Sequence, residues 1–182
     1  AEADRAAGEA DRAAAKLLAI AHAELMRDRK PSATAAAERA LELSRVAKIR
    51  FLAGRVKAQS GGVAAARVLA ASLAAEPQLE SRAHAKILEG EIALADGDAG
   101  AAITALVAAN GLLDTWIGRY TLGRAYVLAG EHAKAEAEFE RCIARRGEAL
   151  ALFLDAARGK NYEGQAAGPR AQPHQPGYDR RY

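Results

Sequence analysis

The stretch that decides the fold is GEIALADGDAGAAITALVAA, residues 90–109. It aligns without gaps with GRAYVLAGEHAKAEAEFERC, residues 123–142, so that small and large residues recur at the same offsets 33 positions apart. A third copy, GRVKAQSGGVAAARVLAASL, covers residues 54–73, and its start lies 36 residues upstream of Gly90. Repetition at this period is typical of stacked helix hairpins, in which each unit buries its apolar face against its neighbours. The sequence therefore predicts an all-α chain built from repeats.

The spacing within one copy has a physical explanation. Gly123 and Ala135 are expected where two antiparallel helices approach closely, because a larger side chain would push the helices apart. Gly130 falls between two helical patterns and suits the left-handed turn that ends the first helix. Tyr126 and Phe139 are expected to fill the space beside this close contact.

The pattern Leu122-Gly123-x2-Tyr126-x3-Gly130-x4-Ala135-x3-Phe139 resembles the tetratricopeptide repeat, and the resemblance covers roughly residues 47–146. It implies a right-handed α-solenoid of antiparallel helix hairpins, with about four helix pairs and a capping helix. The chain departs from the family at the tryptophan near the start of each repeat, where it has Arg50, Lys86 and Arg119.

The predicted organisation has three parts. Residues 1–46 form a degenerate, capping helix pair, with one long helix over 2–28 and a second that Ser32 caps. Residues 47–158 hold three repeats, at about 47–79, 80–113 and 114–147, followed by a C-terminal capping helix over 148–157. Residues 159–182 form a disordered basic tail.

The helices of the three repeats are expected near 47–60 and 62–75, 80–95 and 99–109, and 115–129 and 131–146. Asp98 is the expected N-cap of the helix near 99–109, and Asp114 is that of the helix near 115–129. Asn110-Gly111 is expected to end the helix near 99–109.

Composition narrows the class of protein. The chain has 49 alanines and nine aromatic residues, which favours close-packed helices over a sheet. Five basic and two acidic residues in 158–182 account for the whole net charge of +3, so the body is balanced and a nucleic-acid partner is disfavoured. The single cysteine, Cys142, occupies a small-residue position of its repeat and is expected to be buried packing.

No pattern of catalytic or metal-binding residues is present. The four histidines lack metal-ligand spacing, and the chain contains neither a nucleophile elbow nor a glycine-rich phosphate loop. We therefore expect a protein that is not an enzyme and that uses no cofactor or metal.

The resemblance points to a concave groove lined by the first helix of each repeat. Three of its positions form a line of alternating charge, Arg55, Glu91 and Arg124, which would fit a peptide that bears both signs of charge. Packing between helices remains an alternative for Phe51, Ile87 and Tyr120, and a solvated face or mutual ion pairing remains one for the charged line. The candidate groove residues are Lys48, Phe51, Arg55, Gln59, His84, Ile87, Glu91, Leu94, Ile117, Tyr120, Arg124 and Val127.

These observations predict a non-enzymatic scaffold that binds a protein or peptide. An alternative, based on the segment 139–150, is an interaction or sensory part of a larger bacterial regulator, either a kinase or a transcription factor. No stretch has the length of a transmembrane span, so we expect a cytoplasmic protein, or a periplasmic one if an export signal was removed. Self-association stays open.

Overall fold

The computed structural model describes residues 2–148, and every regular element in this range is a helix. The all-α prediction is therefore confirmed at this level. The expected capping helix at 148–157, apart from its first residue, and the expected tail at 159–182 lie outside the described residues. The helices are α1 (Glu2–Met26), α2 (Lys30–Leu43), α3 (Ala47–Gln59), α4 (Val63–Ala74), α5 (Leu79–Ala95), α6 (Ala99–Leu112), α7 (Trp116–Leu128) and α8 (His132–Ala144).

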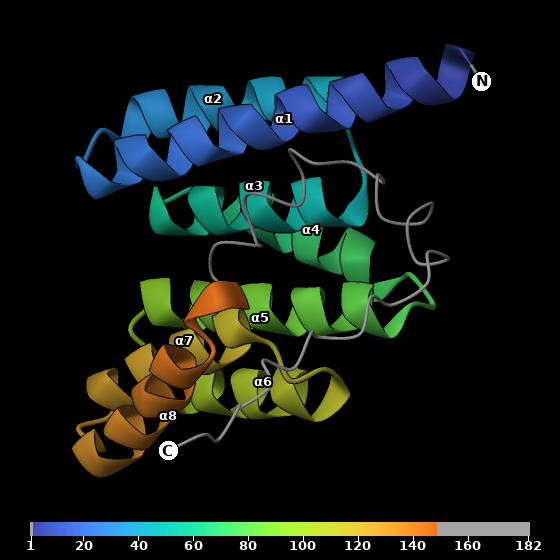
Figure 1. Cartoon of the computed structure of the whole chain (residues 1–182). Helices are drawn as coiled ribbons and strands as arrows, with labels where there is room; N and C mark the ends of the chain where they lie inside the picture. Colours follow the sequence, from blue (N-terminus) through green and yellow to red (C-terminus); the bar gives the residue numbers. More distant parts are fainter. Residues whose placement is uncertain (1, 149–182) are drawn as a thin grey trace, which may run out of the picture.

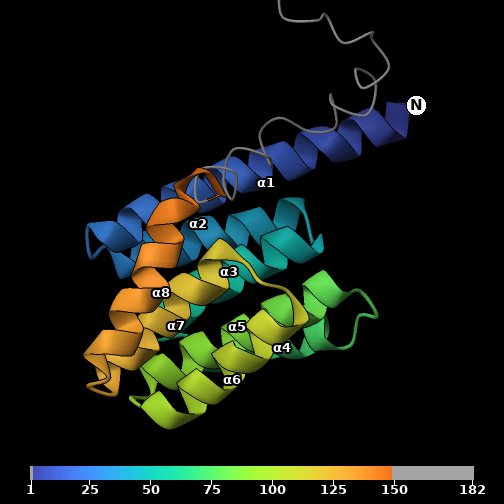
Figure 2. The same cartoon turned by 60° about the horizontal axis from the view of Figure 1, so that its bottom comes forward.

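The helices pack in the order of the chain. Each helix contacts the next one, and α1, α3, α5 and α7 also contact one another in succession. Among the described residues, extensive contacts of this kind do not join α2, α4, α6 and α8 to one another. Figure 1 shows this progression from the α1–α2 hairpin at the top to the α7–α8 hairpin at the bottom, and Figure 2 shows the same helices with that bottom end turned forward. We call α1, α3, α5 and α7 the first-helix layer and the other four the second-helix layer.

Three glycines make the turns within the repeated hairpins. Gly61, Gly97 and Gly130 have φ angles of 92°, 77° and 74°, a left-handed conformation that side chains disfavour. This confirms the role predicted for Gly130. The α1–α2 turn lacks such a glycine and places Asp28 at φ 55° instead.

A second set of glycines lies where neighbouring helices touch. A Cβ atom on Gly90 would come within 2.5 Å of Leu106 Cγ, and one on Gly123 within 2.5 Å of Phe139 Cε1. Leu106 and Phe139 occupy the same repeat position, and the corresponding residue beside Gly54 is the much smaller Ala70. There, Leu88 from the following hairpin fills the space, because a Cβ on Gly54 would lie 2.7 Å from Leu88 Cδ1.

Three predicted helix ends are wrong. The helix α6 continues through Asn110-Gly111 to Leu112, since a glycine near a helix end costs at most about 1 kcal/mol and the helix packs between α5 and α7. Ser32 does not cap α2, which begins at Lys30 with Pro31 in its first turn. Asp114 does not cap α7 either, because Thr115 accepts a hydrogen bond from the Gly118 amide at 3.1 Å.

Asp98 caps α6 as predicted. Its carboxylate accepts a hydrogen bond from the Ala101 amide at 2.9 Å. Asp114, in contrast, lies in the α6–α7 connection and binds Arg119 through both carboxylate oxygens at 2.6 Å. Cys142 is buried as predicted, and its carbonyl oxygen accepts a hydrogen bond from Trp116 Nε1 at 2.9 Å.

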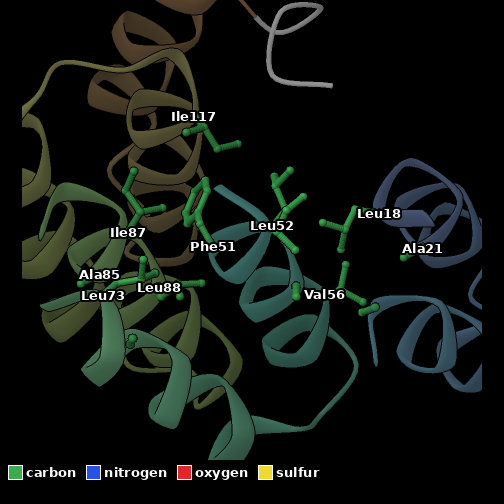
Figure 3. Close-up of a cluster of buried hydrophobic side chains, with 14 of the residues drawn as sticks. Leu18, Ala21, Phe51, Leu52, Val56, Leu73, Ala85, Ile87, Leu88 and Ile117 are labelled. Atoms are coloured by element: carbon green, nitrogen blue, oxygen red, sulfur yellow. The ribbon is translucent and has the colours of Figure 1, made fainter. Parts of the chain in front are cut away.

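The largest apolar cluster joins the first-helix layer to α2, α4 and α6. Phe51 of α3 is fully buried beside Ile87 of α5 and Ile117 of α7 (Figure 3). On the other side of α3, Leu52 and Val56 point toward Leu18 of α1. The core therefore runs along the layer from hairpin to hairpin. None of the described helices combines the length and apolar character needed to cross a bilayer.

Candidate functional site

A buried ion cluster joins three successive hairpins. Arg55 of α3 donates from Nε and Nη2 to Glu91 Oε1 of α5, at 3.0 and 2.9 Å. Arg124 of α7 donates from Nη1 to the other oxygen, Glu91 Oε2, at 2.9 Å. These three residues occupy the same position of three repeats, each directly after the glycine of close contact. The line of alternating charge predicted from the sequence is thus a line of direct contacts.

Two polar side chains complete this group, which we call the Glu91 cluster. Gln59 Nε2 lies 3.3 Å from each oxygen of Glu91, and Thr121 Oγ1 lies 3.5 Å from Oε1. The Glu91 side chain is 0% exposed and that of Arg55 7%, whereas Arg124 retains 35% exposure. Glu91 and Arg55 are therefore closed to a ligand, and Arg124 is open to one.

The cluster keeps Glu91 ionised. Burial alone would raise the pKa of its carboxyl, but the charges and hydrogen bonds of Arg55 and Arg124 hold this pKa below its ordinary value. His22 of α1 lies close enough to respond: burial and the charge of Arg55 lower its pKa, against an opposing effect of Glu91. Electrostatic interactions of the cluster therefore reach all four helices of the first-helix layer.

A hollow of about 410 Å³ opens beside the exposed side of this cluster. We call it the Arg124 hollow. Its walls come from the α1–α2 hairpin and from α3, α5 and α7, so four successive hairpins meet there. The lining residues are Lys30, Ala58, Gln59, Ser60, Gly61, Glu91, Leu94, Ala95 and Arg124.

Several other candidate groove residues are core residues. Phe51, Ile87 and Ile117 are buried against one another, which matches the packing alternative for Phe51 and Ile87. His84 is 5% exposed and stacks on Phe51 with ring centroids 4.0 Å apart. These four side chains shape the layer from inside and offer no surface to a ligand.

His84 is held neutral. Its Nδ1 atom is buried without a hydrogen-bond partner among the described residues. Burial and, to a smaller extent, the charge of Lys48 lower the pKa of His84 to about 4. Protonating this side chain would therefore oppose folding.

The remaining candidates are accessible. Tyr120 is 37% and Val127 49% exposed, while Lys48, Gln59 and Leu94 are half-buried. Tyr120, Arg124 and Val127 lie at i, i+4 and i+7 of α7 and so share one face of that helix. The accessible part of the predicted groove is this face of α7 together with the Arg124 hollow.

Sequence reasoning missed three members of this region. Lys30 lines the hollow as the first residue of α2, and the repeat spacing gives no register in that hairpin. Thr121 gave no signal in the sequence, because a threonine inside a helix commonly bonds only to its own backbone. Here its hydroxyl donates to Ile117 O at 2.8 Å and also lies near Glu91. His22 belongs to the irregular first hairpin, where the repeat spacing gives no register.

A larger hollow, of about 570 Å³, lies between α4, α5 and α6. Alanines form much of its lining, and its charged residues are already engaged. Arg67 pairs with Asp96 at 3.0 Å, Glu89 pairs with Lys86, and Asp98 caps α6. Each of these charged side chains thus already has a partner in the chain.

Two further observations concern metal binding and the Cys142 thiol. Within residues 2–148, no three His, Cys, Asp or Glu side chains gather in a way that could hold a metal ion. Burial raises the pKa of the Cys142 thiol, which disfavours the reactive thiolate. In comparisons with models of known families, with curated proteins and with solved structures, no significant match was found.

Proposed function

We propose that this chain is a non-enzymatic, peptide- or protein-binding scaffold of tetratricopeptide type. In this proposal the helix hairpins form a right-handed solenoid, and the first-helix layer lines its concave face. The partner lies along that face over α5 and α7, in contact with Arg124 and the exposed side of α7.

The observation that carries the proposal is the contact between repeat-equivalent residues. Arg55, Glu91 and Arg124 come from one repeat position and touch in succession, which requires neighbouring hairpins to stack in a similar register. Such stacking is the rule in helical repeat proteins, whose extended concave surfaces serve as binding sites.

The two layers differ in their contacts, and this difference supports placing the first-helix layer on the concave side. The helices of the first-helix layer contact one another, whereas those of the second-helix layer contact mainly the helices of the first. A stack that is tighter on one side bends toward that side. The first-helix layer therefore forms the inner wall, and the Arg124 hollow opens on it.

The surface left on this wall has the character of a binding site. Tyr120 and Val127 are exposed apolar side chains on the face of α7 that also carries Arg124. Interfaces are enriched in tyrosine and arginine, which combine a large contact area with hydrogen bonding. A peptide seated here would bury apolar side chains on α7 beside a polar contact.

A charge placed in this surface tests the proposal. Val127→Glu alters α7 on the proposed concave wall, and Val107→Glu is the matched control on α6, where valine is similarly exposed at 51%. Full-length bait proteins would be used for affinity capture from native lysate, with mass spectrometry and with circular dichroism as a check of helicity. We expect proteins captured by the unmodified chain to be retained by the control and lost with Val127→Glu. The same captured proteins with all three baits would contradict binding on this wall.

A further inference from the structure

We infer that the ligand of this wall is an acidic peptide, with one of its side-chain carboxylates bound between Arg124 and Lys30. This inference rests on the proposed function and deepens it by naming the chemistry of the partner. It also replaces the expectation of a ligand that bears both signs of charge, because the structure leaves no acidic group in the hollow free for a ligand cation.

The carboxylate of Glu91 is already saturated. Oε1 accepts two hydrogen bonds from Arg55, Oε2 accepts one from Arg124, and Gln59 contacts both oxygens. Its side chain is fully buried behind these donors. A basic ligand residue would have to break this network to reach Glu91, and breaking a buried ion pair costs several kcal/mol.

The hydrogen-bonding capacity that remains belongs to cations. Within residues 2–148, the Arg124 guanidinium binds Glu91 through Nη1, which leaves Nε and Nη2 for another acceptor. Lys30 Nζ lies 3.9 Å from Asp28 Oδ1, beyond hydrogen-bond distance, and both side chains of this pair are more than half exposed. Such an exposed pair is weak and is readily exchanged for a better partner.

The local charge favours an anion. Two guanidinium groups share the single carboxylate of Glu91, and Lys30 adds a third cation at the wall of the same hollow. A planar guanidinium binds a carboxylate through two parallel hydrogen bonds, and the long lysine side chain can adjust to the second side of the ligand. A ligand carboxylate would therefore reduce this excess of positive charge.

The neighbouring surface indicates a peptide in which acidic and apolar residues alternate. Leu94 lines the hollow beside Arg124, and the exposed Val127 follows Arg124 on the same face of α7. A peptide whose carboxylate enters the hollow would place its adjacent apolar residues on these two side chains. The hydrophobic contacts would supply affinity, and the ion pair would fix the register.

A selection from random peptides tests the inference without a known partner. The bait is the full chain, and the probe is a phage-displayed library of random 12-residue peptides. The test variants are Arg124→Gln and Lys30→Gln, and the control is Arg67→Gln on α4, which removes an exposed cation from the second-helix layer. Lys30 pairs with Asp28 and not with a member of the Glu91 cluster, so its variant remains informative even if Arg124→Gln perturbs folding.

We expect enrichment of aspartate and glutamate in the peptides selected by the unmodified chain and by the control. Both test variants should reduce this enrichment, and the best selected peptide should bind Arg124→Gln about tenfold more weakly in fluorescence anisotropy, equivalent to about 1.4 kcal/mol. Selected peptides that are basic or neutral would overturn the acidic ligand and leave the binding wall standing. No enrichment above beads without bait would overturn both proposals.

Discussion

The first and second helices of the hairpins differ in how much of each is buried. Nine residues of α3 and nine of α5 are buried, against three of α4 and three of α6. The first helices have neighbours on two sides, because each contacts its hairpin partner and the first helices of adjacent hairpins. The second helices are covered mainly on one side. The first-helix layer thus contributes most of the buried residues. Much of its surface is buried between helices and is closed to any ligand.

Removing the central carboxylate should have the largest effect. Glu91→Ala leaves Arg55 buried without its partner, and we expect a loss of about 3–5 kcal/mol in the free energy of unfolding. Urea denaturation followed by circular dichroism measures this loss.

The matched control is Glu89→Ala on the same helix, because Glu89 is 41% exposed and pairs with nearby Lys86. Its expected cost is about 0–1 kcal/mol. Equal denaturation midpoints for the two variants would mean that the Glu91 cluster does not hold the hairpins together.

Acidification should weaken the same layer through His84. Its pKa in the folded chain is about 4, below the ordinary 6.5, so the unfolded chain binds more protons in this interval. Stability should therefore fall as the pH drops from 6.5 toward 4, by up to about 3 kcal/mol at 1.36 kcal/mol per pH unit. His84→Phe keeps an aromatic ring against Phe51 and should flatten this dependence in denaturation series at several pH values.

Glu91 should add a second loss at lower pH. Because its folded pKa lies below the ordinary 4.5, its stabilising effect is present above that value and disappears as the pH falls through the folded pKa. The two groups therefore act in successive intervals. A variant His84→Phe that still lost stability between pH 6.5 and 5 as steeply as the unmodified chain would assign the effect to another group.

Overpacking the contact between the layers should have an intermediate effect. Ala102 of α6 is fully buried, and Ala102→Leu should cost about 1–3 kcal/mol. Ala108→Leu is the control, since Ala108 is exposed on the same helix. Thermal unfolding curves of the two variants should separate clearly, and coincident curves would show that α6 can shift away from α5 at little cost.

An exposed ion pair of the second-helix layer should have the smallest effect. Arg67 and Asp96 are 62% and 48% exposed in their 3.0 Å pair, so Arg67→Gln should change stability by about 0–1 kcal/mol. High salt should reduce even this difference. A loss as large as that from Glu91→Ala would remove the distinction between the layers.

The sequence predicts the local structure well where a residue type has a strong preference for one backbone position. The turns at Gly61, Gly97 and Gly130 and the cap at Asp98 follow from conformational preferences that act within a few residues. The helix ends near Asn110 and Asp114 were misplaced because tertiary contacts outweigh such preferences there. Packing of α6 between its neighbours continues that helix, and two arginines occupy the Asp114 carboxylate.

The candidate site was harder to predict because burial depends on the neighbouring hairpins. Repeat spacing placed Phe51, Ile87 and Arg124 on one wall, but only contacts across hairpins bury the first two and leave the third exposed. The contact of Leu88 with Gly54 was equally hard to predict, because Leu88 comes from the next hairpin. Lys30 is the first residue of α2, in a hairpin outside the repeat pattern, so its spacing carried no signal.

The order of charges across the hairpins also restricts how such an array can change its copy number. Duplication of the unit that contains Glu91 would set two carboxylates side by side, and duplication of the unit that contains Arg124 would do the same with two guanidinium groups. Duplication of both units together would continue the alternation of sign. Lengthening of this array through genetic duplication should therefore proceed by two hairpins at a time, or require a compensating substitution at the junction.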